Sequence, residues 1–175
     1  MRKTLFALIL NTCAASLLSL AACGQSSTAQ SRVTIDPIPT VSVRAGRMTP
    51  AQLTFHILPG FHVNSNKPAA PELIPTAMAF SLPGDLVIAK VQYPAGQLLS
   101  LPFDPTQKLS VYSGDVNVKF TVIAQANAGA GSYTVHGELK YQACDDHACY
   151  PPKKIPVDFT VSVTRGTPPH KYPHN

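Results

Sequence analysis

Cys144 and Cys149 are the residues of this sequence best suited to chemistry, because only four residues separate them in the segment YQACDDHACYPP. Two thiols this close together can form a structural disulfide, hold a metal ion or exchange electrons as a redox-active dithiol. The choice among these uses depends on the compartment of the protein and on the elements that present the loop.

The first residues of the chain indicate export. Arg2 and Lys3 precede a long apolar run, and the run closes on Leu-Ala-Ala-Cys at residues 20–23. This pattern is typical of a bacterial secretory signal, which we expect over residues 1–22. Two polar residues within the run disfavour the alternative, an uncleaved membrane helix. The closing tetrapeptide resembles a lipobox, which implies cleavage before Cys23 and lipid attachment to its sulfur.

Processing of this kind leaves a single pair of thiols. Cys13 would be removed with the signal, and a lipid-modified Cys23 no longer carries a free thiol. Cys144 and Cys149 are therefore expected to face an oxidising compartment as one intramolecular pair. We expect the protein in the bacterial cell envelope, lipid-anchored and facing the periplasm, and Gly24 after the lipidated cysteine favours the outer membrane.

Charge excludes some classes of partner. The formal net charge is +5, and it falls to +3 when Arg2 and Lys3 leave with the signal. The remaining Lys and Arg residues are scattered, without a basic run of five or more. This pattern predicts neither nucleic-acid binding nor an electrostatic membrane patch.

The rest of the chain predicts one domain built from strands. Residues 23–32 are small and polar and predict a flexible tether, residues 33–164 form the domain, and residues 165–175 form a disordered tail. Apolar and polar residues alternate with a period of two in three segments, 116–122, 133–141 and 155–163. Weaker strand patterns cover 40–44, 52–58, 76–82, 86–93 and 108–112. Seven or eight short strands with 17 prolines predict an all-β fold, an immunoglobulin-like antiparallel β-sandwich.

The cysteine loop connects the last two predicted strands, so it lies at a sheet edge or rim. Closing a six-residue loop contributes only about 2 kcal/mol in the chain-entropy model, against about 4.7 kcal/mol for a hundred residues. The pair is thus poorly placed as a stabiliser. A metal site would use both thiolates, His147 and a carboxylate, but this spacing suits zinc poorly and oxidation competes, so we expect no metal and no cofactor.

Several segments resemble a known family. The flanks of the two cysteines, Tyr-Gln-Ala-Cys at 141–144 and Cys-Tyr-Pro-Pro at 149–152, are similar to the cysteine motif of the N-terminal periplasmic domain of the thiol:disulfide interchange protein DsbD. Upstream, Pro-Gly-Phe-His-Val-Asn-Ser-Asn at 59–66 resembles the family's Gly-aromatic-His segment. Two further matches follow at the family's spacing, at 73–76 and 91–94. The resemblance covers about residues 36–163.

The resemblance implies an immunoglobulin-like sandwich with protein-disulfide reductase activity. In this family the domain accepts reducing equivalents from a membrane-embedded donor, here a separate protein, and passes them to periplasmic disulfide proteins. It further implies that Cys149 attacks the disulfide of the partner and that Cys144 resolves the mixed disulfide. We expect the protein to be a monomer. The alternative function is a non-catalytic β-sandwich lipoprotein that binds another envelope protein, with the Cys144–Cys149 disulfide as a structural clip.

Further residues are candidates for the same site. The family covers its cysteines with an aromatic cap, and this sequence offers four aromatic residues for shielding, namely Phe103, Tyr112, Tyr141 and Tyr150. Two histidines are candidates for proton handling: His147 lies within the cysteine loop, and His62 follows a Pro-Gly turn, where a structural role is the alternative.

Overall fold

The computed structural model describes residues 31–101 and 104–165, and all regular secondary structure in these residues is β-strand. The strands are β1 (Val33–Ile35), β2 (Val41–Arg44), β3 (Arg47–Ile57), β4 (His62–Asn64), β5 (Ala77–Ser81), β6 (Leu86–Gln92), β7 (Gln97–Leu101), β8 (Asp104–Tyr112), β9 (Asp115–Ala124), β10 (Gly131–Tyr141), β11 (Ala143–Cys144), β12 (Lys153–Pro156) and β13 (Phe159–Thr164). No helix capable of spanning a membrane occurs within this part of the chain. The signal at 1–22, Cys23 and most of the predicted tether and tail lie outside the described residues.

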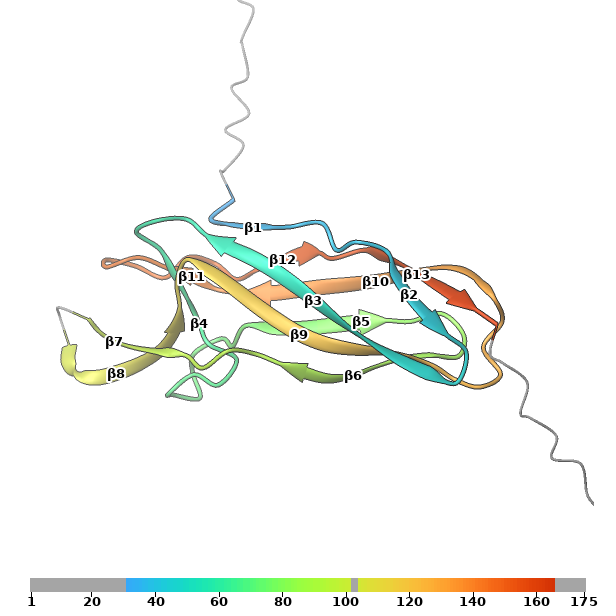
Figure 1. Cartoon of the computed structure of the whole chain (residues 1–175). Helices are drawn as coiled ribbons and strands as arrows, with labels where there is room; N and C mark the ends of the chain where they lie inside the picture. The colour runs from blue at the N-terminus through green and yellow to red at the C-terminus, as the bar shows by residue number, and fades with distance from the viewer. Residues whose placement is uncertain (1–30, 102–103, 166–175) are drawn as a thin grey trace, which may run out of the picture. The chain divides into compact units, whose positions relative to one another are not determined.

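Two sheets face each other and form a sandwich (Figure 1). One sheet has the strand order β1-β3-β9-β6, and its strands pair antiparallel. The other is centred on β10, with β5 along one side, β12 and β13 along the other, and β2 beyond β13. The predicted all-β sandwich is confirmed, with one parallel pair, β13 and β2, among the antiparallel ones.

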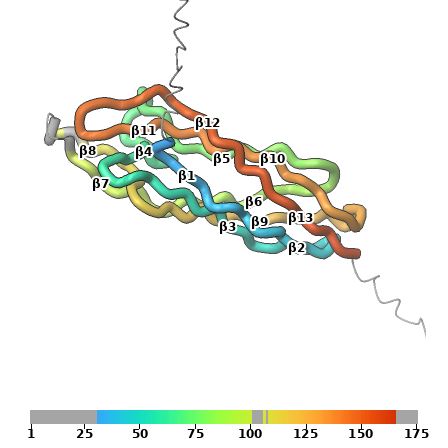
Figure 2. Tube along the Cα trace, turned by 90° about the horizontal axis from the view of Figure 1, so that it is seen from above, coloured from blue at the N-terminus to red at the C-terminus, as the bar shows by residue number. Residues whose placement is uncertain are grey.

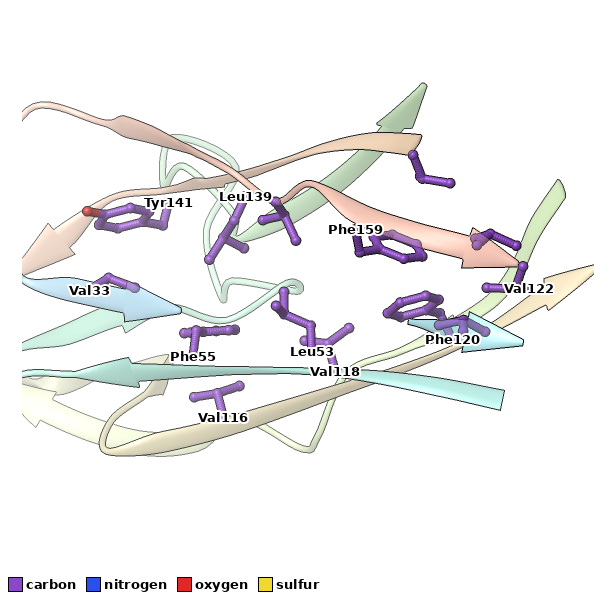
Figure 3. Packing of buried hydrophobic residues seen from close by; sticks show 14 of the residues in the cluster. Val33, Leu53, Phe55, Val116, Val118, Phe120, Val122, Leu139, Tyr141 and Phe159 are labelled. Carbon is purple, nitrogen blue, oxygen red and sulfur yellow. The ribbon is translucent and has the colours of Figure 1, made fainter. Parts of the chain in front are cut away.

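The core lies between the two sheets because their strands alternate buried and exposed side chains. In β9, every second residue from Val116 to Ala124 is buried. Figure 3 shows the labelled members of this set, Val116 to Val122, on the side of β9 that faces Leu139, Tyr141 and Phe159 of the opposite sheet. The ring of Phe120 lies 5.7 Å from that of Phe159, and Phe80 of β5 packs on both rings. The alternate apolar residues of each strand thus pack against those of the opposite sheet.

The predicted strand at 155–163 occurs as two strands, β12 and β13, which both pair with β10 in a single continuous register. The chain kinks between them, where the Val157 amide donates a hydrogen bond to the Gly137 carbonyl. Gly137 is required by this close approach, because a Cβ atom there would lie 2.8 Å from the Val157 oxygen and 3.0 Å from the Phe80 ring. Gly131, at the start of β10, has open surroundings, with no neighbour of its Cβ position nearer than 3.8 Å.

A third sheet, with the order β11-β4-β8-β7, occupies one end of the sandwich. Four consecutive residues from His62 to Ser65 are buried there, so both faces of β4 are covered and no alternation marks it in the sequence. Figure 2 shows β11, β4 and the start of β1 gathered at this end, whereas the end of β13 lies at the opposite end. The two cysteines belong to this end of the molecule.

Candidate functional site

A tight hairpin carries the disulfide between Cys144 and Cys149, whose Cα atoms are 4.0 Å apart. Cys144 ends the edge strand β11, and Cys149 forms an isolated bridge with it. Two backbone hydrogen bonds of 2.9 Å close the hairpin, from the Asp145 amide to the Ala148 carbonyl and from the Tyr150 amide to the Ala143 carbonyl. The predicted rim position of the loop is thereby observed, because the loop projects from the edge of the end sheet.

The two sulfur-bearing residues differ sharply in exposure. Cys144 is 2% exposed and lies under the loop, whereas Cys149 is exposed to solvent. An attacking thiolate must approach a disulfide sulfur along the S–S axis, so access decides which sulfur reacts. In this hairpin Cys149 is the cysteine open to solvent and Cys144 is the enclosed one.

The Asp145 carboxylate organises the loop between the cysteines. Its Oδ1 accepts hydrogen bonds of 2.8 Å from the amides of His147 and Ala148, and its Oδ2 accepts one of 2.6 Å from the Tyr150 hydroxyl. The Tyr150 hydroxyl and the two amides stabilise the charged form and lower the pKa of Asp145 to about 2. The carboxylate is therefore ionised at every pH at which an envelope protein operates.

Tyr150 is held on its other side by residues from distant parts of the chain. The guanidinium of Arg32 lies 3.5 Å from the centre of the Tyr150 ring, within cation–π range, and 5.1 Å from that of Phe61. The Phe61 and Tyr150 rings are 6.0 Å apart. Gln142 adds a hydrogen bond of 3.2 Å from its Nε2 to the Tyr150 carbonyl. The residue after Cys149 is thus fixed by packing as well as by Asp145.

His62 lies directly opposite Cys144 across the β4–β11 pair. Residues opposite each other in an antiparallel pair project their side chains on the same face, with Cβ atoms about 5 Å apart. Burial lowers the pKa of His62, and the nearby carboxylates of Asp146 and Asp145 partly oppose this effect. The imidazole is therefore neutral at pH 7, and it projects from the same face of the end sheet as the Cys144 side chain.

The other predicted site residues occupy different environments. Tyr141 is buried in the core, and its hydroxyl has no hydrogen-bond partner among the described residues. Tyr112 is also buried, and its hydroxyl donates to Asn66 Oδ1 at 2.6 Å. His147 is exposed in the loop. Phe103 lies outside the described residues. Tyr150 reaches the loop between the cysteines, through its hydrogen bond to Asp145.

Sequence reasoning did not predict that Arg32, Phe61 and Asp145 hold Tyr150. Asp145 carries a local signal that could have identified it, since an Asp that starts a turn commonly accepts hydrogen bonds from the amides two and three residues later. Arg32 and Phe61 reach Tyr150 through tertiary contacts, for which the sequence holds no local pattern. In the described part of the chain, no group of three or more His, Cys, Asp or Glu side chains could hold a metal ion.

Fold and site together define an immunoglobulin-like β-sandwich domain that presents a disulfide at its rim, with one cysteine buried and the other exposed. The family model described as thiol:disulfide interchange protein DsbD, N-terminal, matches residues 31–160. The chain belongs to this family, which confirms the resemblance noted in the sequence. No match was found among the curated proteins.

Several solved structures are similar to this chain. The reduced DsbD N-terminal domain of Neisseria meningitidis is 20% identical, with a TM-score of 0.43, over 71% of this chain and 85% of its own. A complex of the DsbD and PilB N-terminal domains from the same organism matches at 20% identity and a TM-score of 0.42, over 71% and 80%. The N-terminal periplasmic domain of ScsB from Proteus mirabilis matches at 11% and 0.44, over 73% and 44%.

Proposed function

We propose that this protein is an envelope thiol:disulfide exchange module that passes reducing equivalents to partner proteins through Cys149 and Cys144. The observation that carries the proposal is the unequal exposure of the two cysteines, because an exchange reaction needs one sulfur open to a partner and one held back to resolve the intermediate. Membership of the DsbD N-terminal family supports the same chemistry.

The reaction starts from the reduced domain. The Cys149 thiolate attacks one sulfur of a partner disulfide, which forms a mixed disulfide and releases the second partner sulfur as a thiolate. Cys144 then attacks Cys149 Sγ, forms the intramolecular disulfide and releases the first partner sulfur. Two electrons and two protons pass to the partner, which leaves as a dithiol, and a separate dithiol donor restores the reduced domain by the reverse exchange.

His62 assists the second step in this proposal. A thiol buried in apolar surroundings ionises reluctantly, so Cys144 needs a nearby group to take its proton. The imidazole of His62 lies opposite Cys144 on the same face and is neutral because burial lowers its pKa. It can therefore accept the Cys144 proton as the thiolate forms. His147, which is exposed in the loop, is the second candidate for proton handling.

The proposed setting is the periplasmic side of the envelope. Lipid attachment at Cys23 would anchor the domain through residues 24–32, with the outer membrane favoured, and the domain acts as a monomer. Its partners are periplasmic disulfide proteins as acceptors and a separate membrane protein as donor. The Tyr150 ring, packed against Arg32 and Phe61, shields one side of the cysteine loop from solvent. Phe103 is a candidate for a cap over Cys149.

Two matched variants test the proposal. In Cys144→Ala the mixed disulfide cannot be resolved, so adducts with envelope proteins should accumulate on non-reducing gels. In Cys149→Ala the remaining thiol is the buried one, and few adducts should form. If neither variant traps a partner and the wild-type pair has a reduction potential below about −300 mV, as a structural disulfide does, the exchange function is wrong and the pair is a clip in a non-catalytic binding protein.

A further inference from the structure

The cysteine loop is closed twice, once by sulfur and once by hydrogen bonds that do not involve sulfur. Asp145 follows Cys144 directly, and Tyr150 follows Cys149 directly. The hydrogen bond of 2.6 Å from the Tyr150 hydroxyl to Asp145 Oδ2 therefore joins the residues next to the two cysteines. This link runs beside the disulfide and does not depend on it.

Both ends of this link are themselves held in place. Asp145 Oδ1 accepts the amides of His147 and Ala148, which fixes the carboxylate over the turn. The Tyr150 ring packs against the Arg32 guanidinium at 3.5 Å, and its amide donates to the Ala143 carbonyl. None of these contacts involves a sulfur atom. The loop therefore has the means to keep its shape after the S–S bond opens.

We infer that Asp145 and Tyr150 are positioning residues that hold Cys144 beside Cys149 in the reduced domain and in the mixed disulfide. The inference rests on the proposed exchange function and extends it to residues outside the cysteine pair. Its consequence is a high effective concentration of the Cys144 thiol at Cys149, because the hairpin does not have to be rebuilt before ring closure. Resolution of a mixed disulfide is then fast, and the intramolecular disulfide forms more readily.

The predicted effect of breaking the link follows from a thermodynamic cycle. The disulfide itself restrains the hairpin in the oxidised domain, so loss of the hydrogen bonds loosens the reduced loop more than the oxidised loop. The equilibrium constant for forming the disulfide from oxidised glutathione should therefore fall by about tenfold, the lower end of the effect of one hydrogen bond to a charged group. A tenfold fall makes the reduction potential less negative by about 30 mV.

Asp146 supplies a matched control. It stands beside Asp145 in the same loop, it is exposed, and its carboxylate makes no hydrogen bond with the described residues. Asp145→Asn and Asp146→Asn each remove one negative charge near Cys149, but only the first removes hydrogen bonds from the hairpin. Tyr150→Phe removes the hydroxyl link while both carboxylates and the aromatic ring remain. A simple effect of charge on the Cys149 thiolate would appear equally in both Asp variants.

The experiment measures the glutathione equilibrium of the full chain in detergent for wild type and these three variants. It also measures the rate at which a mixed disulfide with glutathione on Cys149 is resolved. We expect about a tenfold lower equilibrium constant and a slower resolution rate for Asp145→Asn and Tyr150→Phe, and less than a twofold change in the equilibrium constant for Asp146→Asn. Asp145 and Tyr150 share one hydrogen bond. The double variant Asp145→Asn/Tyr150→Phe should therefore lower the equilibrium constant by a smaller factor than the product of the two single-variant factors.

Equal shifts in the two Asp variants, or unchanged values in both Asp145→Asn and Tyr150→Phe, would overturn the inference. Tyr150→Phe retains the ring against Arg32, so it provides the answer even if Asp145→Asn does not fold. This test of the positioning role is independent of the trapping test of the exchange function. Trapping of partners by Cys144→Ala can succeed while the positioning role fails, and a failed trap leaves the glutathione equilibrium measurable.

Discussion

Reduction of the Cys144–Cys149 disulfide should leave the domain folded and only modestly less stable. The bond closes a loop of six residues, and the chain-entropy model assigns such a closure about 2 kcal/mol of stability. The hairpin it closes is already joined by two backbone hydrogen bonds and by the Asp145 carboxylate, so no other element loses its support on reduction. We expect the free energy of unfolding to fall by about 2 kcal/mol or less.

The same number predicts a redox property. By thermodynamic linkage, the free energy by which the disulfide stabilises the fold equals the free energy by which folding favours the disulfide. About 2 kcal/mol therefore makes the reduction potential of the pair about 45 mV more negative in the folded domain than in the unfolded chain. The assay is urea unfolding of the full chain with and without dithiothreitol, together with glutathione titration of folded and denatured protein. The Cys144→Ala variant, which has no intramolecular disulfide, should show no effect of dithiothreitol.

A loss of more than about 4 kcal/mol on reduction, or complete unfolding, would refute this reasoning. Such a result would mean that the disulfide supports the end sheet as a whole rather than one loop. It would also make repeated cycles of oxidation and reduction costly for the protein, in conflict with an exchange function. If the loss of unfolding free energy on reduction matches the difference in reduction potential between folded and denatured protein, closure of the six-residue loop accounts for the full contribution of the disulfide to stability.

Three further predictions concern the residues that frame the site and the core. Gly137→Ala should lower the free energy of unfolding in urea by about 1–3 kcal/mol, because the added methyl overlaps the Val157 backbone oxygen. The control Gly131→Ala, in the same strand, should change it by less than about 1 kcal/mol. Similar losses in the two variants would contradict the packing argument. His62→Gln should flatten the pH dependence of stability between about pH 7.5 and about pH 5. Burial lowers the folded pKa of His62, so its contribution is fully present above 6.5 and is lost as pH falls below that value; parallel profiles for variant and wild type would exclude this titration. Arg32→Met should lower the unfolding free energy by about 1 kcal/mol through loss of the cation–π contact with Tyr150, and no loss would show that the stacking is incidental.

The sequence predicted the sandwich well because its long strands bury one face only. The alternation of Val116, Val118 and Phe120 in β9, and of Val135 and Leu139 in β10, marks strands whose apolar side faces the opposite sheet. The kink between β12 and β13 was missed because both strands keep one register on β10. The alternation of apolar and polar residues was sufficient to predict a strand wherever one face of the strand packs on the core and the other face is exposed to water.

The end sheet was largely missed, for a physical reason. β4 and β11 are two or three residues long and buried on both faces, so neither length nor alternation distinguishes them from a loop. The position of His62 opposite Cys144 depends on this pairing and could not be read from the sequence alone. The contact of Arg32 with Tyr150 joins residues more than a hundred positions apart, and its prediction requires the fold itself.

The place where the chain enters the domain bears on how the protein works at a surface. Arg32, which contacts Tyr150, and the start of β1 stand at the same end as the cysteine loop, while β13 finishes at the far end (Figure 2). If Cys23 carries the lipid, the eight residues between it and Arg32 span at most about 30 Å when extended. In that case the domain would present Cys149 within about one protein diameter of the bilayer, where the proposed membrane-embedded donor would reach it without a long search.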